Sequence, residues 1–278
     1  MSFFLTDSHV HLQDPAFCGD LDDVLRRAKE QGIERFFCNG TSPDDWDDVR
    51  RLADEREEIV PFFGLHPWYV DRADDWEERL AHFLDRKPVG IGEIGLDYHI
   101  KPRNESQQKE AFRIQLRLAK KRELPVTIHS VHALYEILPI LEAEGPFPTV
   151  LLHSFSGPVD RIEQLKRLGC YFSFPATVLK PKNRRVREAA VAVPLDRILL
   201  ESDAPALPPQ PGNRNEPTVL EAILNELACL RNIPSRRLRE RLFENSQAVY
   251  SSIPGTPVKS IGSNPSLSAG DSGFRRKS

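Results

Sequence analysis

Two histidines stand one residue apart at the end of the first apolar run of the chain. The stretch FLTDSHVHL, residues 4–12, contains Asp7, His9 and His11. Side chains alternate across a β-strand, so His9 and His11 would point to one spot, with Asp7 behind them. Two converging imidazoles indicate a metal ion. Structural histidines would explain this stretch alone equally well, so the rest of the chain has to distinguish the two interpretations.

Histidines and carboxylates also end most of the other apolar runs. PFFGLHP contains His66, VGIGEIGLD holds Glu93 and Asp97, PVTIHS contains His129, TVLLHSFSG contains His153, and RILLESDAP holds Glu201 and Asp203. One charged residue after a strand is usually a solvated cap. With the first run, however, six of the eight predicted strands end in this way. This repetition indicates one shared site.

The types of these side chains favour a metal centre. Burying several carboxylates and imidazoles together is costly for every unpaired charge, and a divalent cation removes that cost. Nitrogen and carboxylate donors suit Zn, Mn or Mg and exclude a thiolate site. The donors outnumber what one ion needs, so two ions that share a carboxylate are plausible. Such a pair activates a water for hydrolysis.

The apolar runs alternate with amphipathic stretches. Strands are predicted at residues 3–10, 33–38, 59–64, 88–92, 125–128, 149–152, 170–173 and 197–201. Helices are predicted at 20–31, 43–57, 74–86, 105–122, 131–144, 158–168, 182–191, 216–231 and 235–248. This pattern indicates an α/β fold of the size of a (β/α)8 TIM barrel, although an open doubly wound sheet also alternates in this way. In a barrel the strand C-termini meet at one face, which would gather the candidate ligands.

Composition limits the class of protein. The chain has 278 residues, 40% of them hydrophobic and 28% charged, with a net charge of −3. This is typical of a soluble globular domain, and no run approaches the roughly 18 apolar residues of a membrane span. No signal peptide is visible, and four scattered cysteines predict reduced thiols in a cytoplasmic or nuclear protein. The charge gives no global nucleic-acid footprint, and no protein partner is inferred.

The composition changes near the end of the chain. Residues 1–250 are predicted to form one barrel domain. Residues 251–278 are rich in Ser, Gly and Pro and have almost no large apolar side chains. Such a segment cannot bury enough apolar surface to offset its ordering entropy, so a disordered C-terminal tail is expected.

The same motifs resemble the TatD-type metal-dependent deoxyribonucleases, a branch of the amidohydrolase-like barrels. DSHVHL is similar to the family's opening D-x-H-x-H, and GLHP at 64–67, GEIGLDY at 92–98, PVTIHS at 125–130, HSFSG at 153–157 and LLESDAP at 199–205 follow in the family's order. The resemblance covers about residues 5–250 and leaves only the tail outside. One such motif would be weak evidence, but six in order are specific.

The resemblance implies a (β/α)8 barrel with two divalent ions at the strand C-termini, either Mg, Mn or Zn. Carried over to this chain, the metal ligands would be His9, His11, Glu93, His129, His153 and Asp203. Glu93 would bridge the two ions. Asp203 would be the catalytic residue that orients or deprotonates the attacking water, with Glu201 in a supporting role.

Two further residues are predicted to contact the substrate. His66 would lie beside the metals and contact a phosphate, although a structural histidine before Pro67 is an equal alternative. Arg214, in the loop QPGNRNEP at 210–217, would be a second contact, unless the loop only caps the next helix. The family usually has an arginine after the His-Ser of PVTIHS, where this chain has Val131 and then His132. This departure weakens a phosphate clamp or transfers it to His132.

Three functions are compatible with this set. The resemblance implies hydrolysis of DNA phosphodiester bonds, as a 3′-5′ exodeoxyribonuclease. The alternative is an acyl hydrolase for an ester or amide, such as a D-aminoacyl-tRNA, because an activated water can attack phosphorus or a carbonyl carbon. A silent binding barrel is a third hypothesis, against which the complete ligand set argues. Phosphate chemistry favours nearby cations, and the available loop residues are Arg103, Lys180, Lys182 and Arg214. Hydrolysis of a nucleic-acid substrate therefore comes first, largely because of the resemblance.

Overall fold

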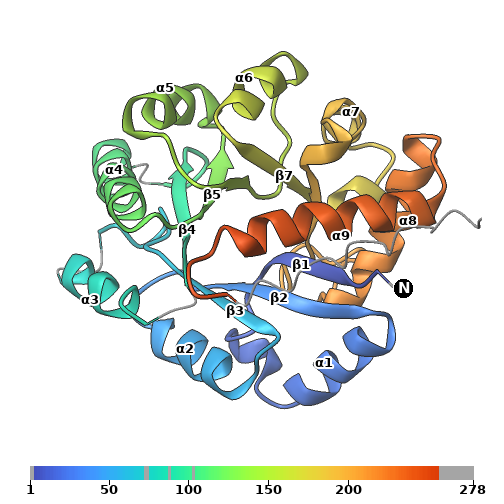
Figure 1. Cartoon of the computed structure of the whole chain (residues 1–278), viewed down its shortest axis with the longest axis horizontal. Coiled ribbons are helices and arrows are strands. Elements are labelled where there is room, and N and C mark those ends of the chain that lie inside the picture. Colours follow the sequence, from blue (N-terminus) through green and yellow to red (C-terminus); the bar gives the residue numbers. More distant parts are fainter. Residues whose placement is uncertain (1–2, 72–74, 87–88, 102–103, 257–278) are drawn as a thin grey trace, which may run out of the picture.

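The centre of the protein is one sheet of eight parallel strands, hydrogen-bonded in chain order (Figure 1). The computed structural model describes residues 3–71, 75–86, 89–101 and 104–256. The strands are β1 (Leu5–Val10), β2 (Ile33–Asn39), β3 (Ile59–Phe63), β4 (Gly90–Asp97), β5 (Val126–Val131), β6 (Val150–Leu152), β7 (Cys170–Phe174) and β8 (Ile198–Leu200). A doubly wound sheet reverses its strand order at the middle, whereas this order runs straight from β1 to β8. The predicted barrel is confirmed.

Helices occupy the connections and surround the sheet (Figure 1). They are α1 (Leu21–Glu30), α2 (Trp46–Glu55), α3 (Trp76–Phe83), α4 (Glu105–Arg122), α5 (Leu134–Glu144), α6 (Ile162–Arg167), α7 (Arg184–Ala192), α8 (Leu220–Leu230) and α9 (Ser235–Ser251). Short 3-10 turns are η1 (Pro15–Phe17), η2 (Val159–Arg161), η3 (Ala176–Leu179), η4 (Leu195–Arg197) and η5 (Pro217–Val219). The largest difference from the predicted bounds is β4, which continues five residues past the apolar run ending at 92. Glycines and Glu93 interrupt its apolar pattern, and this hid the rest of the strand.

The barrel has an outer and an inner apolar layer, because alternate side chains of each strand point to opposite faces. The outer layer packs under the helices and includes Phe36 and Phe63. The inner layer consists of Phe37, Val60, Phe62, Leu151, Tyr171 and Leu199, together with Val249 and Ile253 near the end of the described chain. Two residues further along, the inward positions of β6, β7 and β8 hold His153, Ser173 and Glu201. The strand alternation therefore leads directly from an apolar floor to a polar layer.

Helix α9 closes the N-terminal end of the barrel, and Figure 1 shows it crossing that end. The Asn245 side chain donates to the carbonyl of Ile198 at 2.8 Å, at the start of β8. Beyond the helix, Ile253 is only 1% exposed and packs into the inner layer. The composition of the Ser- and Pro-rich segment did not indicate this contact, because one buried isoleucine hardly changes the average, and the predicted division at residue 250 stays a prediction. Residues 257–278 of the predicted tail lie outside the described residues.

Within the described part of the chain, no helix has both the length and the apolar character needed to cross a membrane.

Candidate metal centre

The carboxylate of Glu93 lies between two groups of histidines at the C-terminal end of the barrel. Glu93 is on β4 and is 3% exposed. Its Oε2 atom is 3.2 Å from His9 Nε2 and 3.5 Å from His11 Nε2, at the end of β1. Its Oε1 atom is 2.7 Å from His129 Nδ1 and 2.8 Å from His153 Nε2. His129 lies in β5, and His153 directly follows β6. Each carboxylate oxygen therefore faces a different group of imidazoles.

Asp203 completes the first of these groups. Its Oδ1 atom lies 3.8 Å from His9 Nε2 and 3.7 Å from His11 Nε2. The residue follows β8 and has a φ of 54°, so its backbone is no longer extended and the alternation of side chains along the strand does not set its direction. Its backbone N–H donates to the carbonyl of His9 at 3.0 Å, and this bond holds the turn against β1. The structure therefore brings all six predicted metal ligands together.

The spacing of the imidazole nitrogens fits a metal ion. His9 Nε2 and His11 Nε2 are 3.2 Å apart, and two ligands of one tetrahedral zinc ion, each about 2.0–2.1 Å from it, lie about 3.3 Å apart. His11 Nδ1 is 2.8 Å from the carbonyl oxygen of Asn39. Since a carbonyl can only accept, Nδ1 carries the proton and Nε2 offers its lone pair to the centre. The donor set, imidazole with carboxylate, suits Zn or Mn better than a soft-metal site.

The charges of the centre depend on each other. Burial alone would raise the pKa of the Glu93 carboxyl, but His153 and the neighbouring imidazoles hold that pKa well below its usual range. Burial lowers the pKa of His9 to about 4, so this ring is neutral and able to bind a metal at neutral pH. Burial raises the pKa of Asp203 to about 6. A buried anion among imidazoles is the arrangement that a divalent cation stabilises.

The barrel as a whole, and not only its centre, matches a known family. A family model described as TatD related DNase covers residues 6–251. The chain belongs to this family. The predicted resemblance is thereby confirmed, and the protein is a metal-dependent hydrolase of the TatD type.

Relatives of this TatD-family chain match it over nearly their whole length. The uncharacterized metal-dependent hydrolase YabD of Bacillus subtilis is 32% identical, over 88% of this chain and 98% of YabD. The 3′-5′ ssDNA/RNA exonuclease TatD of Pantoea vagans is 31% identical, over 88% of this chain and 98% of its own. The crystal structure of YjjV, a TatD homologue from Escherichia coli K12, is 29% identical. It gives a TM-score of 0.85 over 89% of this chain and 98% of YjjV.

Two further carboxylates lie behind the histidines of this TatD-type centre. Asp97 Oδ2 lies 3.2 Å from His129 Nε2, on the side away from Glu93. Glu201 lies 3.7 Å from His153 Nδ1, and it accepts the backbone N–H of Ser154 at 2.7 Å. A hydrogen-bonded carboxylate such as Asp97 fixes the orientation of a ligating imidazole and raises its basicity. His153 Nδ1 has no hydrogen-bond partner in the described part of the chain, so Glu201 acts on this ring through its charge.

His66 lies beside the second histidine group. Its Nε2 atom is 3.4 Å from Glu93 Oε1, and the ring is 4% exposed. Burial lowers its pKa to about 4, so the ring is neutral at physiological pH. With Glu93 and His129 it forms a third group of atoms close enough to share an ion. Its predicted contact with substrate stays a prediction, and this geometry adds metal binding as another possible role.

Arg214 lies away from the centre in all the contacts that the structure records. Its guanidinium donates to both carboxylate oxygens of Asp20 at 2.7 Å and to Glu216 at 2.8 Å. It also lies over the ring of Phe17, 4.8 Å from the ring centroid. These contacts join the loop before η5 to the start of α1. Its assignment to substrate stays a prediction, and Arg103 lies outside the described residues.

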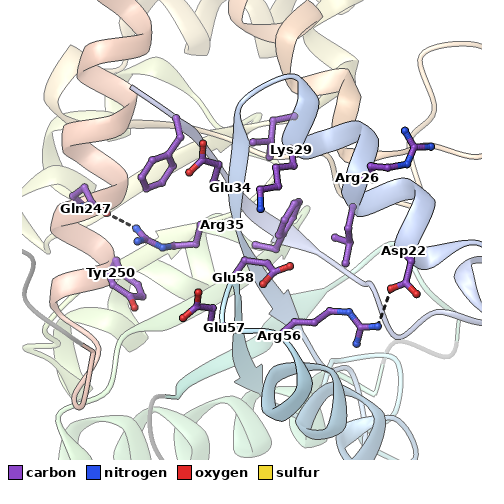
Figure 2. A pocket seen from close by; sticks show the side chains of 14 residues that line it. Asp22, Arg26, Lys29, Glu34, Arg35, Arg56, Glu57, Glu58, Gln247 and Tyr250 are labelled. Atoms are coloured by element: carbon purple, nitrogen blue, oxygen red, sulfur yellow. Dashed lines mark hydrogen bonds and ion pairs between the residues drawn. The ribbon is translucent and has the colours of Figure 1, made fainter. Parts of the chain in front are cut away.

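The opposite end of the barrel has a hollow of about 530 Å³ (Figure 2). It lies at the N-terminal ends of the first strands, and Arg35 stands at its centre, 3.6 Å from the ring centroid of Tyr250. Arg35 also donates to the side chain of Gln247 on α9. Its walls carry both charges, with Glu57 and Glu58 near Arg56. None of the predicted metal ligands lines this hollow, and residues at this end of a TIM barrel generally serve stability.

Sequence reasoning did not single out Trp68, Ser173 or Asn39. Trp68 donates to Asp97 at 2.7 Å, Ser173 donates to Glu201, and the Asn39 carbonyl orients His11. A serine or asparagine inside a strand carries no metal-ligand signal of its own. The tryptophan in GLHPW could have been noticed, because it stands two residues after the candidate site residue His66.

Proposed function

We propose that the protein is a two-metal hydrolase that cleaves phosphodiester bonds of DNA, working as a 3′-5′ exodeoxyribonuclease. The observation that carries the proposal is the position of Glu93, with one carboxylate oxygen toward His9 and His11 and the other toward His129 and His153. A carboxylate between two groups of donors can serve two ions at once, and such a pair of ions is a common centre for hydrolysis of phosphodiesters. The name of the Pantoea relative, a 3′-5′ ssDNA/RNA exonuclease, supports the choice of substrate and direction.

The residues of the chain have separate roles in this reaction. His9, His11 and Asp203 would hold one ion, His129 and His153 the other, and Glu93 both. When bound, the ions would polarise the phosphate and lower the pKa of the attacking water.

Asp203 is the proton acceptor in this proposal. The water oxygen forms a bond to phosphorus while one water proton passes to the Asp203 carboxylate. The bond to the leaving oxygen then breaks, and Asp203 returns this proton to the leaving oxygen, which departs as a hydroxyl. Burial raises the pKa of this carboxyl to about 6, which suits a base that works near neutral pH. Glu201 is tied to Ser154 and Ser173 and so supports His153 instead.

A panel of labelled substrates tests the proposal. Single-stranded and double-stranded DNA with a 5′ label would be incubated with Mg, Mn or Zn, beside a circular single strand of the same composition. We expect stepwise shortening from the 3′ end and an intact circle. Asp203→Asn serves as the inactive control, and His82→Ala, on the surface of α3, as the matched control. Cleavage of the circle would contradict exonuclease action, and no cleavage of any DNA would contradict the proposal as a whole.

The acyl-hydrolase alternative is favoured by one observation. Val131 stands where the family usually has an arginine, so the end of β5 carries no guanidinium for a phosphate. D- and L-aminoacyl-tRNA therefore belong in the same panel. Release of the amino acid with DNA left intact would assign the centre to acyl esters.

A further inference from the structure

Trp68 is the tryptophan that the fold leaves open to solvent. All three tryptophans lie in the described part of the chain, and Trp46 and Trp76 are 0% and 8% exposed, whereas Trp68 is 49% exposed. It follows β3 by a few residues, directly after His66 and Pro67. A single exposed apolar side chain is ordinary on a protein surface, but this one lies at the mouth of the metal centre.

The indole ring is held in place by the centre itself. Its Nε1–H donates to Asp97 Oδ2 at 2.7 Å, and the same oxygen lies 3.2 Å from His129 Nε2. Its backbone N–H donates to His66 Nδ1 at 3.2 Å. The ring meets that of His66 edge to face, with centroids 4.9 Å apart, and lies 6.4 Å from that of His129. A large rigid ring is thus fixed beside the second histidine group, with half of its surface uncovered.

The neighbouring loops of this rim add further rings and a cation. His99, after β4, and His132, after β5, are exposed and have ring centroids 5.9 Å apart. Tyr135, in the first turn of α5, is 64% exposed, and the guanidinium of Arg161 lies 5.4 Å from its ring centroid. Aromatic rings interleaved with basic groups are typical of surfaces that bind single-stranded nucleic acids, whose bases stack on the rings.

We propose that Trp68 is the stacking platform for a base next to the phosphate that is cleaved, so that the enzyme prefers ends with unpaired bases. This inference rests on the proposed nuclease function and deepens it. A base inside a duplex has both faces covered, whereas a base at a single-stranded end can lie on the indole. Stacking tolerates all bases, because each has a flat aromatic face. The platform therefore selects single-stranded ends with little regard to sequence.

Substrates that lack one base test this stacking directly. A 5′-labelled oligothymidylate would be compared with the same strand carrying an abasic residue at either of its two 3′-terminal positions. We expect the wild-type enzyme to show a KM about ten-fold higher for one of the abasic strands. Trp68→Leu should raise the KM of the normal strand by a similar factor and lose the discrimination. Trp68→Phe keeps a ring without the Nε1–H donor and should retain most of the discrimination.

Opposite results identify other roles for this residue. If Trp68→Leu still discriminates against the abasic strands, or if Trp68→Leu and Trp68→Phe lower kcat equally at unchanged KM, stacking is refuted. In the second case the residue acts only through Asp97 and His129.

A binding measurement separates failure of this inference from failure of the proposed function. The Asp203→Asn protein would be titrated with the normal oligothymidylate while tryptophan emission is recorded. We expect quenching in this protein and none in the double variant that combines Asp203→Asn with Trp68→Phe, because the other two tryptophans are buried. Quenching without cleavage by the wild type would refute the nuclease function alone, and absence of quenching would refute the stacking.

Discussion

Asp7 and Ser202 join the first and last strands of the barrel through a pair of buried hydrogen bonds. The backbone N–H of Ser202 lies 2.9 Å from Asp7 Oδ1, and its hydroxyl lies 2.6 Å from Asp7 Oδ2. Both residues are fully buried. Asp7 precedes His9 by two residues and Ser202 directly precedes Asp203, so this contact aligns two predicted ligands of one ion across the β8–β1 seam.

Changes at this seam should destabilise the barrel in a graded way. Ser202→Ala removes two bonds of the hydroxyl, one to Asp7 and one accepted from the N–H of Ala204, and should lower the free energy of unfolding by about 1–2 kcal/mol. Asp7→Ala also leaves the buried N–H of Ser202 without its acceptor, and this should lower the free energy of unfolding by a further amount of about 1–3 kcal/mol. Urea denaturation measures both, with Ser235→Ala at the surface start of α9 as control. Equal effects of Asp7→Ala and Ser235→Ala would show that the seam is held by other contacts.

The seam also gives the metal-free protein a pH-dependent stability. Burial raises the pKa of the Asp7 carboxyl from 3.8 to about 8, so between these values the folded state binds a proton that the unfolded state lacks. The contribution of Asp7 to stability therefore falls as pH rises through this window. Asp7→Asn resembles the protonated form and should remove this dependence.

The measurement is the difference in melting temperature between wild type and Asp7→Asn, in the presence of a chelator, from pH 5 to pH 8. At pH 5 the variant should melt at a lower temperature than the wild type, and this difference should shrink or reverse toward pH 8. A difference that stays constant across the range would show that Asp7 does not change its protonation.

Metal stoichiometry is the most direct property of the centre. We expect two divalent ions per chain at saturation, because Glu93 faces two donor groups. His9→Ala combined with His11→Ala should lose one ion, and His129→Ala combined with His153→Ala the other. Elemental analysis after desalting measures this, with His82→Ala as control. One ion in the wild type, or the loss of both ions from either double variant, would contradict two separate positions.

Asp203 and Glu201 should differ sharply in their effect on rate. Asp203→Asn keeps the shape but loses the proton acceptor, and removing such a base costs about 10²–10⁴-fold in kcat. Glu201→Gln disturbs only a group behind His153 and should cost about 10–100-fold. Metal content is measured for both variants, so that a lost ion is not mistaken for a lost base. Near-normal kcat in Asp203→Asn with its metals retained would place the base elsewhere.

The end of the ordered chain can be located by stability measurements. Ile253→Ala removes a side chain that is 1% exposed from the inner layer, and it should cost about 2–5 kcal/mol. Removal of residues 257–278 should leave the melting temperature unchanged, because their composition provides little apolar surface to bury. A truncation that lowers the melting temperature by several degrees would show that this segment packs on the barrel.

Thiol reactivity should divide the four cysteines into two pairs. Cys18 and Cys229 are exposed, whereas Cys38 and Cys170 are buried, and all four are free. Burial raises the pKa of the Cys38 thiol to about 12, so the reactive thiolate is scarce at neutral pH. A colorimetric thiol reagent at pH 8 should titrate two groups in the native protein and four in denaturant. Three or four rapid groups in the native protein would show that the barrel opens readily at β2 or β7.

The barrel and the positions of its candidate ligands could be predicted from the order of the apolar runs together with the family motifs. His9, Glu93, His129 and His153 could be found because each ends or interrupts an apolar run. In a parallel barrel the ends of all such runs have to meet at one face. Alternation within a strand is a local property of the backbone, and this is why His153 follows the inward-facing Leu151. These relationships need no knowledge of what lies opposite.

The contact partners of these side chains could not be predicted and became known from the fold. Asp203 turns into the centre through a φ of 54°, while Glu201 turns to Ser154, and strand alternation alone would have placed both on one face. Trp68 is exposed although Trp46, with an equally apolar ring, is buried. Arg214 meets Asp20, which lies 194 residues away. The physical reason is the same in each case: these partners come from segments far apart in the chain, and local periodicity carries no information about which segments the fold brings into contact.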